Sequence, residues 1–179
     1  MISNLAEFRA AKAVLAEVKQ ELKAAKTPFD DKMEVGVMIE VPSAVAVADQ
    51  LATEADFFSI GSNDLTQYVM GADRGNRKVS NLVNALHPAI LRMVAQTVDA
   101  AHRAKIWVGM CGELAGNTLA TPVLVGLGLD ELSMNAPHIP DVKSTVRKYS
   151  TRQAKKMTHD VLRLESAEEV QEYLKSKAE

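Results

Sequence analysis

The feature that most constrains the fold is a repeated alternation of short apolar runs with stretches of helical spacing. Short continuous apolar runs are typical of strands buried on both sides. Strands that alternate with helices predict an α/β protein with a parallel sheet and helical crossovers. Residues 62–76 are polar and rich in turn formers, so we expect a loop there. The expected strands are 35–41, 56–61, 106–110 and 131–135, and the expected helices are 4–26, 43–55, 87–105, 118–128 and most of the chain from Pro140 onward.

Length and composition narrow the functional classes. A chain of 179 residues suits one domain, and a net charge of −2 without a visible Lys/Arg stripe argues against nucleic-acid binding. A single cysteine cannot form an internal disulfide, which fits the reducing cytoplasm. No apolar run approaches the roughly 18 residues of a membrane span, and the first residues lack the layout of a signal peptide. We therefore expect a cytoplasmic protein with neither nucleic acid nor membrane as a partner.

Polar or reactive residues stand at the end of every expected strand. They are Glu40, the segment 61–64, the segment 111–113 and Asn135. Parallel strands place their carboxyl ends at one rim of the sheet, where α/β proteins bind ligands. Core packing alone does not require such a distribution, so the sequence predicts a functional site at this rim.

Glu40 and Asp64 are one βα unit apart, so their strands should be neighbours. Two converging carboxylates repel unless a cation lies between them. Hard oxygen ligands without histidine or cysteine suit Mg²⁺. The alternative is that each carboxylate is a solvated loop residue or a helix cap.

Arg74 and Cys111 also have two interpretations each. Arginine at a rim suits phosphate or carboxylate because its planar fork donates two hydrogen bonds at once. The alternative for Arg74, and the more common one for an arginine without context, is an ordinary surface position. Cys111 is either a buried, inert thiol or an acid or nucleophile at the rim. The histidines show no metal-ligand spacing and are expected to be structural or exposed: His87, His102, His138 and His159.

Four segments resemble one enzyme family. They are similar to the C-terminal, phosphoenolpyruvate-binding domain of Enzyme I of the bacterial sugar phosphotransferase system, a phosphoenolpyruvate–protein phosphotransferase. The resemblance runs in order from Met1 to Asn135 and continues more weakly into the tail. Pyruvate phosphate dikinase and phosphoenolpyruvate synthase share the strand-end carboxylates and the cysteine, but the last two segments fit Enzyme I better. The segments are GVMIEVPSA (36–44), DFFSIGSNDLTQY (56–68), DRGN (73–76) and GMCGELAG (109–116).

The resemblance implies a role for each rim residue. Glu40 and Asp64 match the ligands of Mg²⁺, and Asn63, Asp64 and Arg74 match residues that bind phosphoenolpyruvate. Cys111 matches the acid that protonates the enol carbon as pyruvate forms. The implied reaction starts the phosphorelay by phosphorylating a histidine on another domain, which passes the phosphate to the histidine-containing phosphocarrier protein. The family also implies a homodimer.

The length departs from the family pattern. The family's (β/α)₈ barrel needs about 250 residues, and nothing here matches the segment that carries the phospho-accepting histidine. We therefore expect residues 1–179 to form a partial phosphoenolpyruvate-binding domain, strands five to eight of the barrel with C-terminal helices. The chain alone should be inactive. A hypothesis of another class is a dimerisation or interaction module, which would be indifferent to Mg²⁺ and phosphoenolpyruvate.

Overall fold

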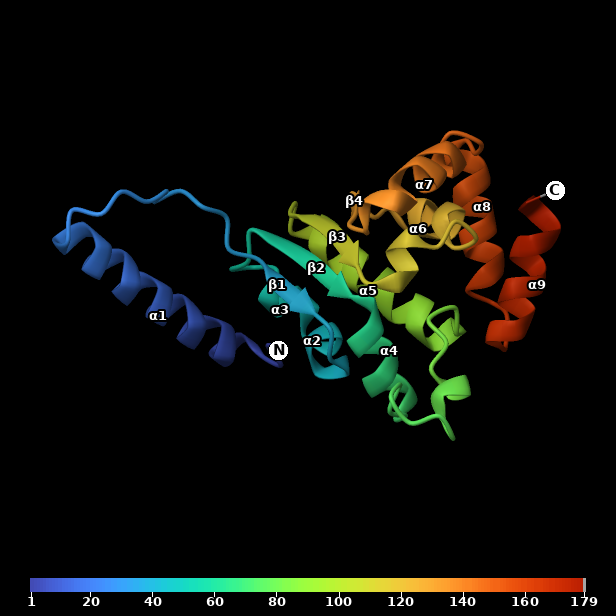
Figure 1. The fold of residues 1–179 in the computed structure, drawn as a ribbon, viewed down its shortest axis with the longest axis horizontal. Helices are drawn as coiled ribbons and strands as arrows, with labels where there is room; N and C mark the ends of the chain where they lie inside the picture. The colour runs from blue at the N-terminus through green and yellow to red at the C-terminus, as the bar shows by residue number, and fades with distance from the viewer. Residues whose placement is uncertain (179) are drawn as a thin grey trace.

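The computed structural model describes residues 1–178 and contains one four-stranded sheet. Its strands are β1 (Val37–Ile39), β2 (Phe57–Gly61), β3 (Trp107–Cys111) and β4 (Glu131–Leu132). All three neighbouring pairs are parallel, and the spatial order is the chain order, β1-β2-β3-β4 (Figure 1). The predicted α/β fold with a parallel sheet is therefore confirmed, although each strand is shorter than its apolar run or shifted by a residue.

The two faces of this sheet differ in what covers them. Side chains alternate between the faces along each strand. One set, which we call the covered face, is fully buried: Val37, Ile39, Phe58, Ile60, Val108 and Met110. The other set, which we call the open face, includes partly or largely exposed side chains: Met38, Phe57, Ser59, Trp107, Cys111 and Glu131.

Helices provide the cover. The long helix α5 (Pro88–Arg103) contacts β2 and β3, begins at Pro88 as expected, and buries Ile90, Leu91 and Val94. The helix expected over 43–55 forms as two short pieces, α2 (Pro42–Ala46) and α3 (Ala48–Leu51), separated at Val47. Both pieces contact α5, so the layer is continuous.

The loop expected over 62–76 is wrong in its first half. Residues Ser62–Met70 form the helix α4, which starts directly at the end of β2 and buries Leu65 and Thr66. Ser, Asn and Asp favour helix starts as well as loops, and here Ser62, Asn63 and Asp64 occupy the first turn. The strand end thereby delivers these polar residues into the start of a helix.

The first helix, α1 (Leu5–Ala24), extends away from the sheet (Figure 1). Asn4 caps it as predicted, with its side-chain oxygen accepting from the Glu7 N–H at 3.0 Å. Phe8 is its buried residue, whereas Val14 and Val18 on the same apolar stripe are exposed. Most of α1 therefore has no packing partner in the part of the chain that the structure describes.

The C-terminal third is helical and lies at the β4 end of the sheet (Figure 1). The helix α8 (Thr151–Val161) packs closely on α6 (Thr121–Leu127), where Thr158 donates a hydrogen bond to the Val123 carbonyl at 3.0 Å. None of the helices in residues 1–178 has the length and apolar character needed to cross a membrane. The remaining elements are α7 (Ile139–Val146), α9 (Ala167–Ala178) and three 3₁₀ turns, η1 (Ser80–Leu82), η2 (Glu113–Gly116) and η3 (Ala136–His138).

Candidate functional site at the carboxyl ends of the strands

The rim begins with three residues in register. Ile39 pairs with Ile60 and Gly61 pairs with Cys111, so Glu40, Gly61 and Cys111 form one row at the ends of β1, β2 and β3. A Cβ atom at Gly61 would lie 3.0 Å from Oε2 of Glu40 and 2.9 Å from its Cβ. Glycine at this position therefore leaves room for the Glu40 carboxylate over the end of the neighbouring strand.

Glu40 is only 15% exposed, and its Oε1 lies 3.7 Å from the Met1 amino group. Asp64 lies in the first turn of α4, so both carboxylates stand at the carboxyl ends of adjacent parallel strands. The predicted adjacency of their strands is therefore confirmed. Among residues 1–178, no cluster of three or more histidine, cysteine, aspartate or glutamate side chains could hold a metal ion by itself.

Arg74 comes back to the rim from the loop that follows α4. Its guanidinium lies 3.3 Å from Oδ1 of Asp64, and its backbone N–H donates to the Gln67 side chain at 3.2 Å. The Arg74 side chain is half exposed, which leaves its other donors available to a ligand. The structure thus places Arg74 beside Asp64 at the rim.

Asn63 and Gly112 join the ends of β2 and β3. Oδ1 of Asn63 accepts the Glu113 N–H at 3.2 Å, and the Ser62 hydroxyl donates to the Cys111 carbonyl at 2.8 Å. Gly112 has φ +94°, and a Cβ atom there would clash with the Ser62 hydroxyl. A left-handed backbone without a side chain is what brings these two loops into contact.

Cys111 is a free thiol that is partly exposed, so the buried alternative does not describe it. The Met38 sulfur lies 3.7 Å from its Sγ and the Ser59 hydroxyl lies 3.9 Å away. Both neighbours belong to the open face and neither is charged. The thiol is therefore accessible from the rim.

The rim contains two cavities. One of about 480 Å³ is lined by Asn63, Cys111, Glu113, Asn135 and His138. The sequence predicted no ligand role for His138, because its place in the same cavity as Cys111 depends on the path of the turn after β4.

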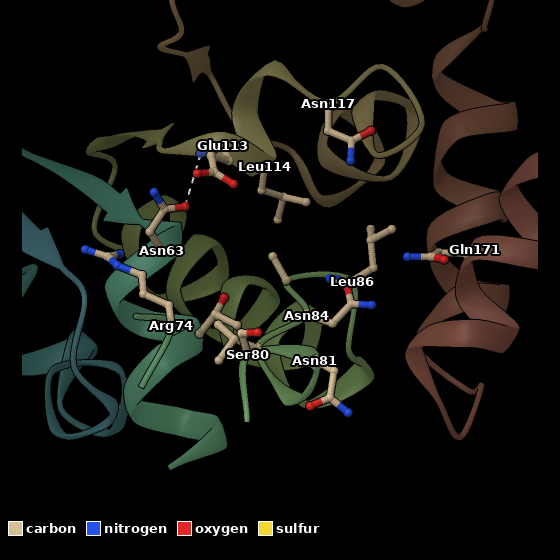
Figure 2. Close-up of a pocket in the computed structure, with 13 residues that line it drawn as sticks. Asn63, Arg74, Ser80, Asn81, Asn84, Leu86, Glu113, Leu114, Asn117 and Gln171 are labelled. Atoms are coloured by element: carbon tan, nitrogen blue, oxygen red, sulfur yellow. Dashed lines mark hydrogen bonds between the residues drawn. The ribbon is translucent and has the colours of Figure 1, made fainter. Parts of the chain in front are cut away.

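The other cavity, of about 570 Å³, is lined by Asn63 and Arg74 on one side and by the loop 80–86 on the other (Figure 2). Glu40 lines neither cavity, so the structure brings Asn63 together with Cys111 and with Arg74 but holds Glu40 beside them.

Comparison with known proteins gives one consistent result. The family described as "PEP-utilising enzyme, PEP-binding domain" matches residues 1–151. The phosphoenolpyruvate-protein phosphotransferase of Geobacillus stearothermophilus is 49% identical over 98% of this chain and 30% of its own length. That of Bacillus subtilis (strain 168) is 47% identical over 98% of this chain and 31% of its length. The multiphosphoryl transfer protein 2 of Escherichia coli (strain K12) is 46% identical over 97% of this chain and 21% of its length. The chain thus spans less than a third of these relatives.

Proposed function

Because the chain belongs to the family of phosphoenolpyruvate (PEP)-utilising enzymes, in which it matches the PEP-binding domain, we propose that it binds PEP as part of a PEP–protein phosphotransferase. The proposed phosphotransferase is of the type of Enzyme I of the bacterial sugar phosphotransferase system. One observation carries the proposal: the four polar segments at the strand ends lie at one rim of a parallel sheet, within a chain that is nearly half identical to named phosphotransferases. A dikinase or synthase relative is the alternative within the enzymes.

In this proposal Asn63, Asp64 and Arg74 bind the substrate. Arg74 suits a phosphate group because its guanidinium offers paired donors, and the ion pair with Asp64 at 3.3 Å positions it at the rim. Asn63 is fixed by its bond to the Glu113 N–H. Both side chains are thus oriented before a ligand arrives, which lowers the entropy cost of binding.

The residues present fit Mg²⁺ and do not fit a metal that needs a complete protein cage. Glu40 and Asp64 supply hard oxygen donors from adjacent strand ends, and Mg²⁺ typically takes one or two protein carboxylates and completes its shell with substrate oxygens and water. When bound, Mg²⁺ offsets the negative charge of phosphoryl oxygens.

Cys111 acts as the proton donor. Cleavage of the phosphoryl–oxygen bond leaves the enolate of pyruvate, and the thiol S–H bond breaks as a C–H bond forms at the methylene carbon. The thiolate left behind regains a proton from solvent, to which this partly exposed side chain has access. The phosphoryl group goes to a histidine on a domain outside this chain, and from there to the histidine-containing phosphocarrier protein.

The open sheet supports a partial barrel. Eight parallel strands close a (β/α)₈ barrel whose interior is filled by side chains. Within residues 1–178 this sheet has four strands in chain order, edge strands β1 and β4, and one face whose side chains remain partly exposed. We infer that residues 1–179 correspond to strands five to eight with C-terminal helices, that the protein is a homodimer, and that it works in the cytoplasm.

The same open face favours a second candidate function, an interaction module. Exposed strand edges and uncovered apolar side chains invite pairing with another chain. On the open face Phe57 and Trp107 stack with ring centres 4.3 Å apart, and Met38 is 38% exposed. An assembly role needs this surface but does not need the rim carboxylates.

Titration of the chain with Mg²⁺ and PEP separates the two candidates. We expect weak, saturable binding that requires both ligands, followed by ³¹P NMR or calorimetry, and at least tenfold weaker binding in Asp64→Ala. The exposed Asp99→Ala, whose carboxylate pairs with Arg103 at 2.9 Å on the surface of α5, is the matched control. Indifference of the wild-type chain to both ligands would favour the interaction module.

A further inference from the structure

The larger rim cavity continues away from the strand ends. Its volume is about 570 Å³, within the range of small-molecule sites. One end holds Asn63 and Arg74, and the far end is built by the loop before α5, the turn η2 and the helix α9 (Figure 2). Four primary amides line this far end, and Figure 2 shows the Asn81 amide turned away from the other three. We call these three the amide end: Asn84, Asn117 and Gln171.

The orientation of two of these amides is fixed by the backbone. Oδ1 of Asn84 accepts the Leu86 N–H at 3.0 Å, and Oδ1 of Asn117 accepts the Leu119 N–H at 2.9 Å. A backbone N–H can only donate, so the amide oxygen must face it and the NH₂ group must face the other way. Within residues 1–178 neither NH₂ group has an acceptor.

Gln171 closes the amide end from α9. Its side chain makes no hydrogen bond within the described residues, and it lies across from Asn84 and Asn117. Figure 2 shows the amide nitrogens of Asn117 and Gln171 turned toward the space around Leu86. Three segments far apart in the chain thus present N–H donors to one volume.

A wall of donors selects its ligand by chemistry. The Asn117 oxygen already accepts two backbone N–H groups, from Leu119 and Ala120, and the Asn84 oxygen accepts one, whereas both NH₂ groups are free within residues 1–178. A ligand group with acceptors and no proton therefore suits this wall. Carboxylate and phosphate groups meet this requirement, and hydrogen bonds to such charged acceptors are about twice as strong as neutral ones. Leu86 and Leu114 line the same cavity and suit a short apolar portion next to the charged group.

We propose that the amide end binds the carboxylate or phosphate group of a small metabolite, with Asn84, Asn117 and Gln171 as the donors. This site is separate from the strand-end row of Glu40 and Cys111. Gln171 also lies beyond residues 1–151, which the PEP-binding family matches. The proposal does not rest on the proposed function, because neither Mg²⁺ nor PEP takes part in it.

The test uses inorganic phosphate and propionate as probes on the full chain, without Mg²⁺ or PEP. Side-chain amide signals of the three residues are followed by ¹⁵N NMR, with asparagine and glutamine signals assigned by substitution. We expect saturable shifts of these signals with at least one probe, and the stronger probe identifies the group. Failure of PEP binding would leave this result unchanged, so the two proposals fail separately.

Two substitutions reverse the donors without disturbing the turns. Asn84→Asp and Asn117→Asp keep the oxygen that accepts the backbone N–H but replace the NH₂ donor with a negative oxygen. Each should weaken probe binding about tenfold or more. Asn76→Asp is the matched control, because Oδ1 of Asn76 likewise accepts a backbone N–H, from Lys78 at 3.1 Å, outside the cavity. Gln171→Leu removes the third donor, and because the Gln171 side chain makes no hydrogen bond to a backbone turn within the described residues, no turn is disturbed.

The outcomes are decisive in both directions. Weaker binding in Asn117→Asp and Gln171→Leu, with Asn76→Asp equal to wild type and all melting temperatures similar, supports the amide end. Equal weakening in Asn76→Asp would mean that the probes respond to overall charge, and the proposal falls. It also falls if neither probe shifts the three amide signals in a saturable manner.

Discussion

The covered face and the open face belong to the same strands but differ in burial and in the kinds of side chain they carry. The covered face is aliphatic and aromatic, and Ile39, Phe58, Ile60 and Val108 are 0% exposed. The open face alternates small, aromatic and charged side chains, and it leads to Glu40 and Cys111 at the rim. The covered face supplies the burial that drives folding, so the open face is free to hold residues that a core could not accommodate. This contrast predicts that stability and activity respond to substitutions on opposite faces.

The largest expected effect is on activity at the rim. The chain alone should release no pyruvate from PEP and Mg²⁺, because the proposed function assigns the acceptor histidine and further substrate contacts to other parts of a phosphotransferase. Adding the N-terminal portion of a longer phosphotransferase relative, with the histidine-containing phosphocarrier protein, should restore turnover. Asp64→Ala should then reduce it about 100-fold or more, while changing the free energy of unfolding by about 0.5 kcal/mol or less. Pyruvate release and urea denaturation measure the two quantities.

Glu40→Ala, measured in the same two assays, should also reduce turnover while leaving the free energy of unfolding nearly unchanged. Turnover by the chain alone, or phosphate on His87, His102, His138 or His159, would contradict the assignment of the acceptor to another domain. Restored turnover that survives Asp64→Ala would remove this carboxylate from the site.

Adjacent phenylalanines in β2 give a matched test of the two faces. Phe58→Ala on the covered face should cost about 3–5 kcal/mol of unfolding free energy, the usual cost for a buried aromatic residue. Phe57→Ala on the open face should cost about 1 kcal/mol, because it loses mainly the stack with Trp107. Urea denaturation of both variants measures the difference. Equal losses would show that the open face is packed as tightly as the covered one.

A smaller effect is expected in self-association. Exposed apolar surface on the open face should be covered by a second copy, so the chain should sediment as a dimer. Trp107→Lys should weaken that dimer about tenfold or more, because it places a charge within the contact. Val14→Lys is the control, since Val14 is 59% exposed on α1, away from the sheet. A wild-type chain that stays monomeric at high concentration would rule out this use of the open face.

The sequence predicted the features that depend on local pattern and chain order. Parallel βα units place the strand ends at one rim whatever the loop details, so the position of Glu40, Asp64 and Cys111 at one rim followed from topology. The α4 helix was missed because Ser62, Asn63 and Asp64 favour loops and helix starts alike. β4 was overestimated because it pairs on one side only, and its ladder ends where the Ser133 N–H reaches the Met110 carbonyl at 2.8 Å.

Long-range contacts lay beyond sequence reasoning. The hydrogen bond from the Glu113 N–H to Asn63 depends on the left-handed backbone at Gly112, and the place of His138 depends on the path of the chain after β4. The amide end needs atomic positions, since only the backbone N–H groups reveal which way Asn84 and Asn117 point. None of these contacts has a local sequence pattern.

The smallest expected effect concerns the opposite edge of the sheet, where Asp130 joins α5 to β3. Oδ2 of Asp130 lies 3.0 Å from Nε2 of His102 and accepts the Val108 N–H at 2.9 Å. Partial burial acts to raise the pKa of Asp130, but the hydrogen bonds from His102 and Val108 outweigh it and hold the pKa below the usual value of 3.8. A lowered pKa means that the folded state prefers the carboxylate, so this stabilisation is present above the usual pKa and is lost as pH falls through the lower, folded value.

Because the Asp130 side chain is 44% exposed, Asp130→Asn should cost only about 0.5 kcal/mol of unfolding free energy at pH 7. Urea denaturation from pH 7 to pH 2.5 should show this difference shrinking below about pH 4, and the coupling between Asp130→Asn and His102→Gln in a double-mutant cycle should fade over the same interval. A difference that stays constant to the acid end would mean that the contact contributes through packing and not through charge.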